Sequence, residues 1–103
     1  SLPVGEQVAE AILRVVRAAR PGPDADRLVN ESVAWGPSPR ASQSLMLGAR
    51  AKALLEGRLS PSIDDVAALL EPVFKHRMAI SFAARADGKS VIDVISHLAG
   101  LLA

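Results

Sequence analysis

The sequence contains no cysteine, and only three of its 103 residues are aromatic. The absence of cysteine excludes disulfides, zinc ribbons and thiol catalysis. With Trp35, Phe74 and Phe82 as its aromatic residues, the chain must build its core from Leu, Ile, Val and Ala, a composition that suits packed helices. The sequence also lacks a signal peptide and any apolar run long enough to span a bilayer. We therefore expect a cytoplasmic protein with no membrane insertion.

Charges of the two signs nearly cancel. Twelve Lys and Arg against eleven Asp and Glu give a formal net charge of +1, which provides no electrostatic reason to expect binding to nucleic acid or to an anionic membrane. No phosphate-binding loop of the GxxxxGKS or GxxxxGKT pattern occurs, so the chain alone has no sequence basis for hydrolysing a nucleotide. His76 and His97 lie far apart and match no metal-ligand spacing. We therefore expect neither catalytic residues nor a metal site within this chain.

Apolar residues recur at helical spacing in four segments, enough for one small domain with a single core. The expected helices span about 4–20, 39–56, 62–74 and 90–102. In the segment 39–56 apolar residues lie on nearly every face, which is typical of a helix enclosed by others. Pro72 is expected either to kink its helix or to begin a second segment, 72–78. The predicted fold is all-α, a small bundle of about four helices with the helix 39–56 central. Residues 24–34 are the least regular part, where a short helical turn over 26–31 and an extended piece over 32–35 are both left open.

Two short patterns mark helix N-termini. Ser62 with Asp65, and Ser90 with Asp93, have the spacing of a capping box with Asp in place of the usual Glu. The adjacent Asp64 and Asp65 could also suggest a metal site or an acid pair. Because consecutive residues on a helix point in different directions, capping is the favoured interpretation.

A stiff turn precedes the helix 39–56. Ser38 is a suitable N-cap and Pro39 a suitable first helical residue, since proline lacks an N–H that would be unpaired there. Arg40 then falls in the first turn, where the helix dipole disfavours a cation unless an anion lies in front of it. No Asp or Glu occurs between Arg40 and Glu56. Two interpretations are open at this point: an arginine that faces a phosphate, or a solvated arginine beside a cap.

Three further arginines, Arg14, Arg17 and Arg20, follow one another near the end of the first helix. They could form a binding stripe. The favoured interpretation is a solvated face whose positive charge complements the helix dipole at its C-terminal end.

The order of several motifs resembles the C-terminal lid of MoxR-type AAA+ ATPases. That family typically shows G-x-S-P-R-A, A-R-A-x-A-x-x-x-G-R, a T-P-x-D-V-like helix start and L-x-H-R in this order. The matching segments are Gly36-Pro-Ser-Pro-Arg-Ala41, Ala49-Arg-Ala-Lys-Ala-Leu-Leu-Glu-Gly-Arg58, Ser62-Ile-Asp-Asp-Val66 and Phe74-Lys-His-Arg77. The sequence departs from the pattern at Ile63, where Pro is usual, and at Phe74, where Leu is usual.

The resemblance implies that residues 1–103 form a single lid domain, with the nucleotide-binding α/β core elsewhere in the parent polypeptide. It implies that Arg40 is the sensor-2 arginine, which approaches the terminal phosphate of ATP, with Ser38 and Pro39 as part of the same nucleotide-binding turn. Trp35 is a tentative member of that site, although core packing is its favoured role. For Arg77 a packing or subunit-contact role is expected.

For the parent protein, the resemblance implies ATP bound with Mg²⁺ in the core and ATP hydrolysis. It further implies a homo-oligomeric ring, most often a hexamer, chaperone-like remodelling, and a partner with a von Willebrand factor A domain. The alternative is a free-standing helical module for protein–protein interaction. A helix-turn-helix nucleic-acid binder is set aside, because the helix that would enter the groove begins with two acids and would repel phosphate.

Overall fold

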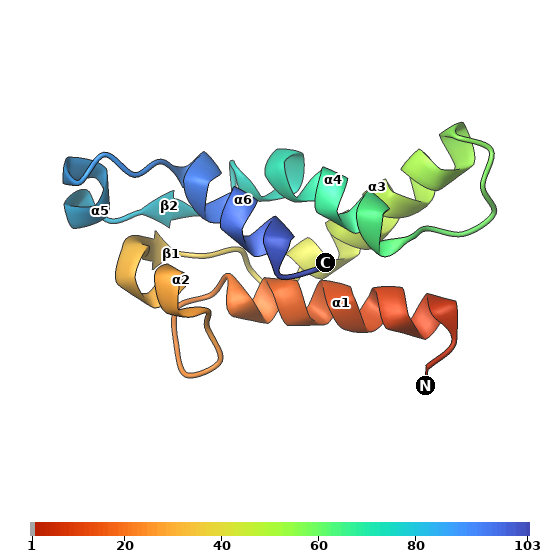
Figure 1. Cartoon of the computed structure of the whole chain (residues 1–103), viewed down its shortest axis with the longest axis horizontal. Helices are drawn as coiled ribbons and strands as arrows, with labels where there is room; N and C mark the ends of the chain where they lie inside the picture. Colours follow the sequence, from red (N-terminus) through yellow and green to blue (C-terminus); the bar gives the residue numbers. More distant parts are fainter. Residues whose placement is uncertain (1) are drawn as a thin grey trace.

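Six helices and two short strands make up most of residues 2–103, the part of the chain that the computed structural model describes (Figure 1). In chain order they are α1 (Val4–Ala18), α2 (Arg27–Ser32), β1 (Val33–Trp35), α3 (Ala41–Leu55), α4 (Ile63–Phe74), β2 (Ala79–Ile80), α5 (Phe82–Ala86) and α6 (Val91–Gly100). The predicted helical bundle is confirmed. None of the helices in the described range is long and apolar enough to cross a bilayer.

The core forms where four of the helices meet. α4 packs against α1, α3 and α6, and α1 also packs against α3. Each helix contributes a stripe of apolar residues spaced three or four apart, as expected for helices with one buried face. The stripe of α1 consists of Val8, Ala11, Ile12, Val15 and Val16, and that of α4 is centred on Val66, Leu70, Val73 and Phe74.

The helix α3 is less enclosed than its composition indicates. Only every fourth residue is buried, at Ala41, Leu45, Ala49 and Ala53, whereas Leu47, Leu54 and Leu55 are 67%, 64% and 88% exposed. The expectation that this helix is buried on nearly every face was therefore wrong. The small side chains of the stripe bring α3 close to its neighbours on one side only, so its other apolar residues remain at the surface.

The helices α3 and α4 approach each other closely at Gly48. A Cβ atom on Gly48 would lie 3.0 Å from Cδ1 of Leu69, so the two helices approach across this position. Beyond α3, Gly57 has a φ of +79° and ends the helix, as its place in the sequence predicts. Pro72 lies in the last turn of α4, which continues through it to Phe74, and the separate segment considered for 72–78 is not formed.

The segment 24–34, which the sequence left unassigned, forms a short helix and a strand. Asp26 caps α2 by accepting a hydrogen bond from the N–H of Leu28 at 2.9 Å, and its carboxylate also contacts Nε2 of His97 at 2.9 Å. β1 then pairs antiparallel with β2, with Val33 opposite Ile80 and an irregularity between Val33 and Trp35. This two-stranded ribbon and α5 lie at one end of the long axis, and the α3–α4 connection lies at the other (Figure 1).

Candidate functional site

The turn between β1 and α3 carries Arg40. Arg40 already has helical backbone angles (φ −62°, ψ −20°), and the regular helix begins at the next residue, Ala41. The N–H of Ala41 donates to the carbonyl of Ser38 at 3.0 Å, and the N–H of Ser42 donates to the carbonyl of Pro39 at 3.1 Å. These bonds span three residues, so a tight turn leads into α3.

Ser38 does not act as the predicted side-chain cap. Within residues 2–103, no side chain caps the N-terminus of α3, and Ser38 contributes its backbone carbonyl to the tight turn. The reason is that a three-residue hydrogen bond to the backbone already engages the N–H of Ala41, one of the groups that a Ser38 hydroxyl would otherwise satisfy. Pro39 lies in this turn, two residues before the regular helix begins at Ala41, and not at the first helical position that the sequence predicted. It has no N–H to leave unpaired there.

The turn rests directly on the C-terminal end of α1. A Cβ atom at Gly36 would lie 2.3 Å from the carbonyl oxygen of Ala19 and 3.0 Å from Cα of Arg20, so only glycine fits here without a shift of backbone. The next residue, Pro37, is almost completely buried. Together Gly36 and Pro37 fix the backbone position of Arg40 relative to α1.

The guanidinium of Arg40 is exposed and forms no ion pair with any other part of residues 2–103. Trp35, at the end of β1, is 55% exposed. The interpretation of Trp35 as a core residue was therefore wrong, because β1 is the edge of a two-stranded ribbon and not an inner strand. The structure thus places Trp35 and Arg40 at the two ends of one short turn, both at the surface.

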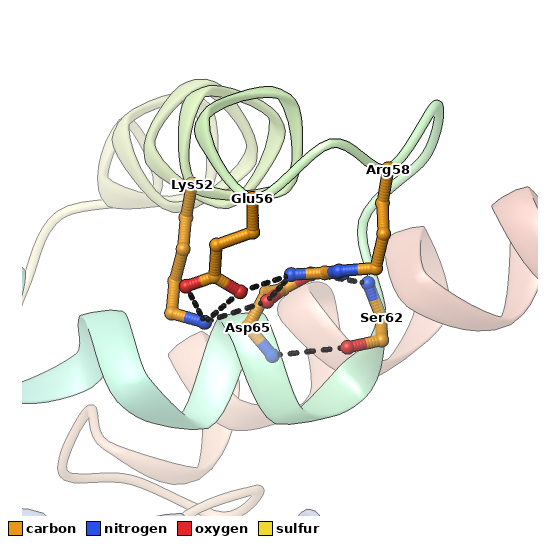
Figure 2. Close-up of polar contacts among 5 residues, drawn as sticks. All are labelled: Lys52, Glu56, Arg58, Ser62 and Asp65. Atoms are coloured by element: carbon orange, nitrogen blue, oxygen red, sulfur yellow. Dashed lines mark hydrogen bonds and ion pairs between the residues drawn. The ribbon is translucent and has the colours of Figure 1, made fainter.

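A second polar cluster lies at the far end of α3 and holds α3 and α4 together (Figure 2). Asp65 is 1% exposed, and its carboxylate accepts hydrogen bonds from Nη1 of Arg58 at 2.5 Å and from Nη2 of the same guanidinium at 2.7 Å. Nζ of Lys52 adds a contact of 2.9 Å. The predicted capping box is confirmed as well, since Ser62 and Asp65 exchange hydrogen bonds between side chain and backbone. One carboxylate therefore joins α3, the connecting loop and the start of α4.

The charges in this cluster stabilise one another. Hydrogen bonds from Arg58 lower the pKa of Asp65 far below its ordinary value. Hydrogen bonds from Ser62 and Lys52 lower it further. In turn, Asp65 raises the pKa of Arg58 and that of Lys52, while Arg58 lowers the pKa of Glu56. All four side chains are thus charged near neutral pH. The cluster therefore stabilises the packing of α3 on α4 and is not suited to proton transfer.

Sequence reasoning identified the cap but missed the basic partners of Asp65. Arg58 and Lys52 lie 7 and 13 residues away in sequence, and only the helical hairpin brings them together. The acid pair considered for Asp64 and Asp65 is not formed: Asp64 is exposed, whereas Asp65 is buried against Arg58. Within the described part of the chain, no group of three or more His, Cys, Asp or Glu residues could hold a metal ion.

Arg77 has a local role at the C-terminal end of α4. Its Nη1 atom donates to the carbonyl of Val73 at 2.6 Å, and its backbone N–H donates to the carbonyl of Phe74 at 2.8 Å. Both bonds satisfy carbonyl groups that the end of a helix leaves unpaired. Arg77 thus terminates α4 before the chain enters β2.

Comparison with known proteins adds three findings. The family model for the AAA lid domain matches residues 25–98. Chaperone MoxR1 of Mycobacterium tuberculosis (strain ATCC 25618 / H37Rv) is 34% identical over 96 residues, which are 92% of this chain and 26% of that protein. Protein MoxR of Paracoccus denitrificans is 47% identical over 60 residues, or 58% of this chain and 16% of that protein.

A likeness of fold extends the comparison. The crystal structure of a candidate ATPase from Cytophaga hutchinsonii superposes with a TM-score of 0.79 at 24% sequence identity. The match covers 90% of this chain and 28% of that one. The chain therefore spans about a quarter of the length of the MoxR1 chaperone and of the solved protein that it resembles.

Proposed function

This chain belongs to the AAA lid domain family, as a lid of the MoxR type, and we propose that it contributes Arg40 to a nucleotide bound by an adjoining AAA+ core. In this proposal the core supplies the phosphate-binding loop that the present sequence lacks. The lid lies over the nucleotide, and Arg40 contacts the terminal phosphate of ATP as the sensor-2 arginine. Ser38 and Pro39 set the position of that arginine through the backbone of the turn.

The observation that carries the proposal is the exposed, unpaired guanidinium of Arg40 within the described chain, on a turn of fixed position. A cation at the start of a helix is unfavourable unless an anion compensates it. The anchoring of Gly36 against α1 and the burial of Pro37 limit the freedom of the turn, so little ordering is required when a phosphate arrives. A guanidinium also binds phosphate through two parallel hydrogen bonds, which gives directional recognition.

The consequence for activity is a dependence of the lid position on the nucleotide. ATP offers Arg40 a terminal phosphate that ADP lacks, so a closed arrangement is stabilised more by ATP than by ADP. A ligand can shift a conformational equilibrium only through such a difference in contacts. We further propose, for the whole cytoplasmic protein, ATP bound with Mg²⁺, a homo-oligomeric ring such as a hexamer, chaperone-like remodelling and a von Willebrand factor A domain partner.

The test is steady-state ATP turnover and ADP affinity of the full-length polypeptide with Arg40→Ala. The matched control is Arg50→Ala, which removes another exposed arginine of α3 that forms no ion pair within residues 2–103. We expect turnover to fall by roughly a hundredfold or more in Arg40→Ala, in the range found when one charge-stabilising donor is removed from a reacting centre. ADP affinity should change little, and Arg50→Ala should behave like wild type. Unchanged turnover in folded Arg40→Ala would return Arg40 to a solvated arginine.

A further inference from the structure

A groove of about 330 Å³ lies between the first turn of α1, the outer side of α3 and the α3–α4 connection. These parts lie together at the end of the long axis opposite the ribbon (Figure 1). The lining consists of Gly5, Met46, Arg50, Leu54 and the loop 59–61. The Arg40 turn begins the other end of α3, so a molecule in this groove would leave that turn uncovered.

The apolar side chains of the groove are at the surface. Leu59 is 97% exposed, Leu54 is 64% exposed, and Met46 is half-buried. Large apolar side chains that gather on one part of a protein surface mark contact sites, because their burial by a partner is favourable. The composition of this end of the lid therefore indicates protein contact.

The loop that carries Leu59 is held in place. The preceding residue, Arg58, donates its backbone N–H to the carbonyl of Ala53 at 2.8 Å, and its guanidinium pairs with buried Asp65. Because the position of Leu59 is fixed before any partner arrives, binding requires little ordering of the loop. The Asp65 cluster thus preforms one wall of the groove.

Arg50 gives the groove its charge. It is exposed, lies one helical turn from both Met46 and Leu54, and forms no ion pair within residues 2–103. Among the described residues, no Asp or Glu lines the groove. A partner that covered the leucines would remove Arg50 from water, and a buried charge without a counter-charge is costly. The occupant must therefore carry a carboxylate opposite Arg50 and aliphatic groups beside it.

The spacing along α3 indicates the form of the occupant. Met46, Arg50 and Leu54 are four residues apart, so they lie on successive turns of the helix. A helix laid alongside presents side chains at the same spacing. An extended segment fits less well, because the middle of a helix offers no free backbone edge with which the N–H and C=O groups of such a segment could pair.

The charge also argues against a second copy of this chain as the occupant. Symmetric pairing of two copies through this face would bring two unpaired Arg50 guanidinium groups into one contact. Repulsion between like charges disfavours such a contact.

We propose that this groove is a docking site for an amphipathic helix of another protein, in which one Asp or Glu lies between aliphatic residues one turn before and after it. The carboxylate pairs with Arg50, and the aliphatic side chains pack on Leu54 and Leu59. This surface is separate from the nucleotide-facing turn and goes beyond the function proposed for Arg40.

The experiment is a fluorescence anisotropy titration of the full-length polypeptide with a labelled synthetic helical peptide that has one glutamate flanked by leucines one turn to either side. A matched peptide has lysine in place of the glutamate. We expect wild type to prefer the glutamate peptide by about tenfold, the value of one charge-assisted contact. Arg50→Glu should reverse this preference.

Two further variants test the apolar part of the groove. Leu59→Ser should weaken the glutamate peptide by about tenfold, as expected for an apolar anchor at an interface. Gly5→Met should also weaken it by adding bulk to the lining, and the fold accommodates that side chain because nothing lies within 4 Å of a Cβ atom on Gly5. The matched control is Leu55→Ser, which removes a leucine that is 88% exposed but does not line the groove.

An equal affinity of wild type for the two peptides would overturn the proposal. So would an absence of binding to the full-length polypeptide, since the groove would then be covered by another part of the chain or by a second copy. Binding is measured without nucleotide, so its outcome is independent of the effect of Arg40→Ala on ATP turnover.

Discussion

Gly36 shows how one residue without a side chain sets the geometry of the site. Because a Cβ atom there would lie 2.3 Å from the carbonyl oxygen of Ala19, Gly36→Ala must displace the turn or the end of α1. We expect a loss of about 1–3 kcal/mol in the free energy of unfolding, as for other insertions into tightly packed sites. Urea denaturation measures this free energy. Gly5→Ala is the control, since nothing lies within 4 Å of a Cβ atom placed on Gly5. Equal stability of Gly36→Ala and wild type would contradict the anchoring role.

Asp65 is the residue on which the second cluster depends. Asp65→Asn keeps the size of the side chain but removes the charge that pairs with Arg58 and Lys52. We expect a clear fall in thermal midpoint, because two cations would be left beside a neutral amide. Asp64→Asn, at the neighbouring exposed position, should leave the midpoint close to that of wild type. If the two substitutions had equal effects, the cluster would not stabilise the hairpin.

The same residue predicts a dependence of stability on pH. Hydrogen bonds from Arg58 keep the pKa of folded Asp65 below the ordinary carboxyl value of about 3.9. Below that pH, Asp65 of the unfolded chain binds a proton that Asp65 of the folded chain does not. The stabilisation that Asp65 provides is therefore complete above about pH 4 to 5 and is lost as the pH falls further. The difference in thermal midpoint between wild type and Asp65→Asn should therefore shrink below about pH 4. A difference that stays constant down to pH 3 would contradict this assignment.

Among the elements, α4 is the one that contacts α1, α3 and α6. Leu70, in the middle of α4, is fully buried, whereas Leu54 of α3 is 64% exposed. Leu70→Ala should reduce the free energy of unfolding by about 2–5 kcal/mol through lost contacts and a cavity. Leu54→Ala should change it by only about 0.5 kcal/mol. Chemical denaturation of both variants tests this order, and an equal loss for both would contradict the packing described for α3.

The sequence was most informative about elements whose signals are local. Helical spacing located the four longer helices, and the Ser62–Asp65 spacing predicted a cap that the structure confirms. Which face of α3 is buried could not be predicted in this way. Leu47 and Leu54 have the same hydrophobicity as buried leucines and differ only in the neighbours that the fold gives them. The ribbon of β1 and β2 was missed for a similar reason. Its strands are two or three residues long, and the paired residues lie more than 40 positions apart in the sequence.

At the site, the sequence identified Arg40 and the stiff turn, but not what supports them. The contact of Gly36 with the end of α1 is tertiary, and the hydroxyl of Ser38 is replaced as a cap by backbone hydrogen bonds of the turn. A cleft lined by Arg17 and Arg20 of the first helix end and by Pro39 and Ser42 likewise exists only once α1 and α3 are packed together. The local sequence pattern therefore predicted which residue could contact a phosphate. The packing of the helices sets the position of Arg40 and the residues around it.

At the scale of the whole molecule, the two polar regions lie at opposite ends of α3 and have different roles. The cluster around Asp65 joins α3 to α4 (Figure 2). The turn at the other end joins α3 to α1 and leaves Arg40 exposed. A contact between Arg40 and a terminal phosphate would thus be transmitted to the whole lid. In the proposed function, this connection couples nucleotide state to lid position.

The most direct test of this account is the ratio of affinities for a non-hydrolysable ATP analogue and for ADP in the full-length polypeptide. Removing a contact that only ATP makes should weaken binding of the analogue and leave ADP almost unaffected. We therefore predict that Arg40→Ala lowers the preference for the analogue by about tenfold, the value of one charge-assisted contact. A preference identical to that of wild type, in a variant with unchanged thermal stability, would contradict the assignment of Arg40 to the terminal phosphate.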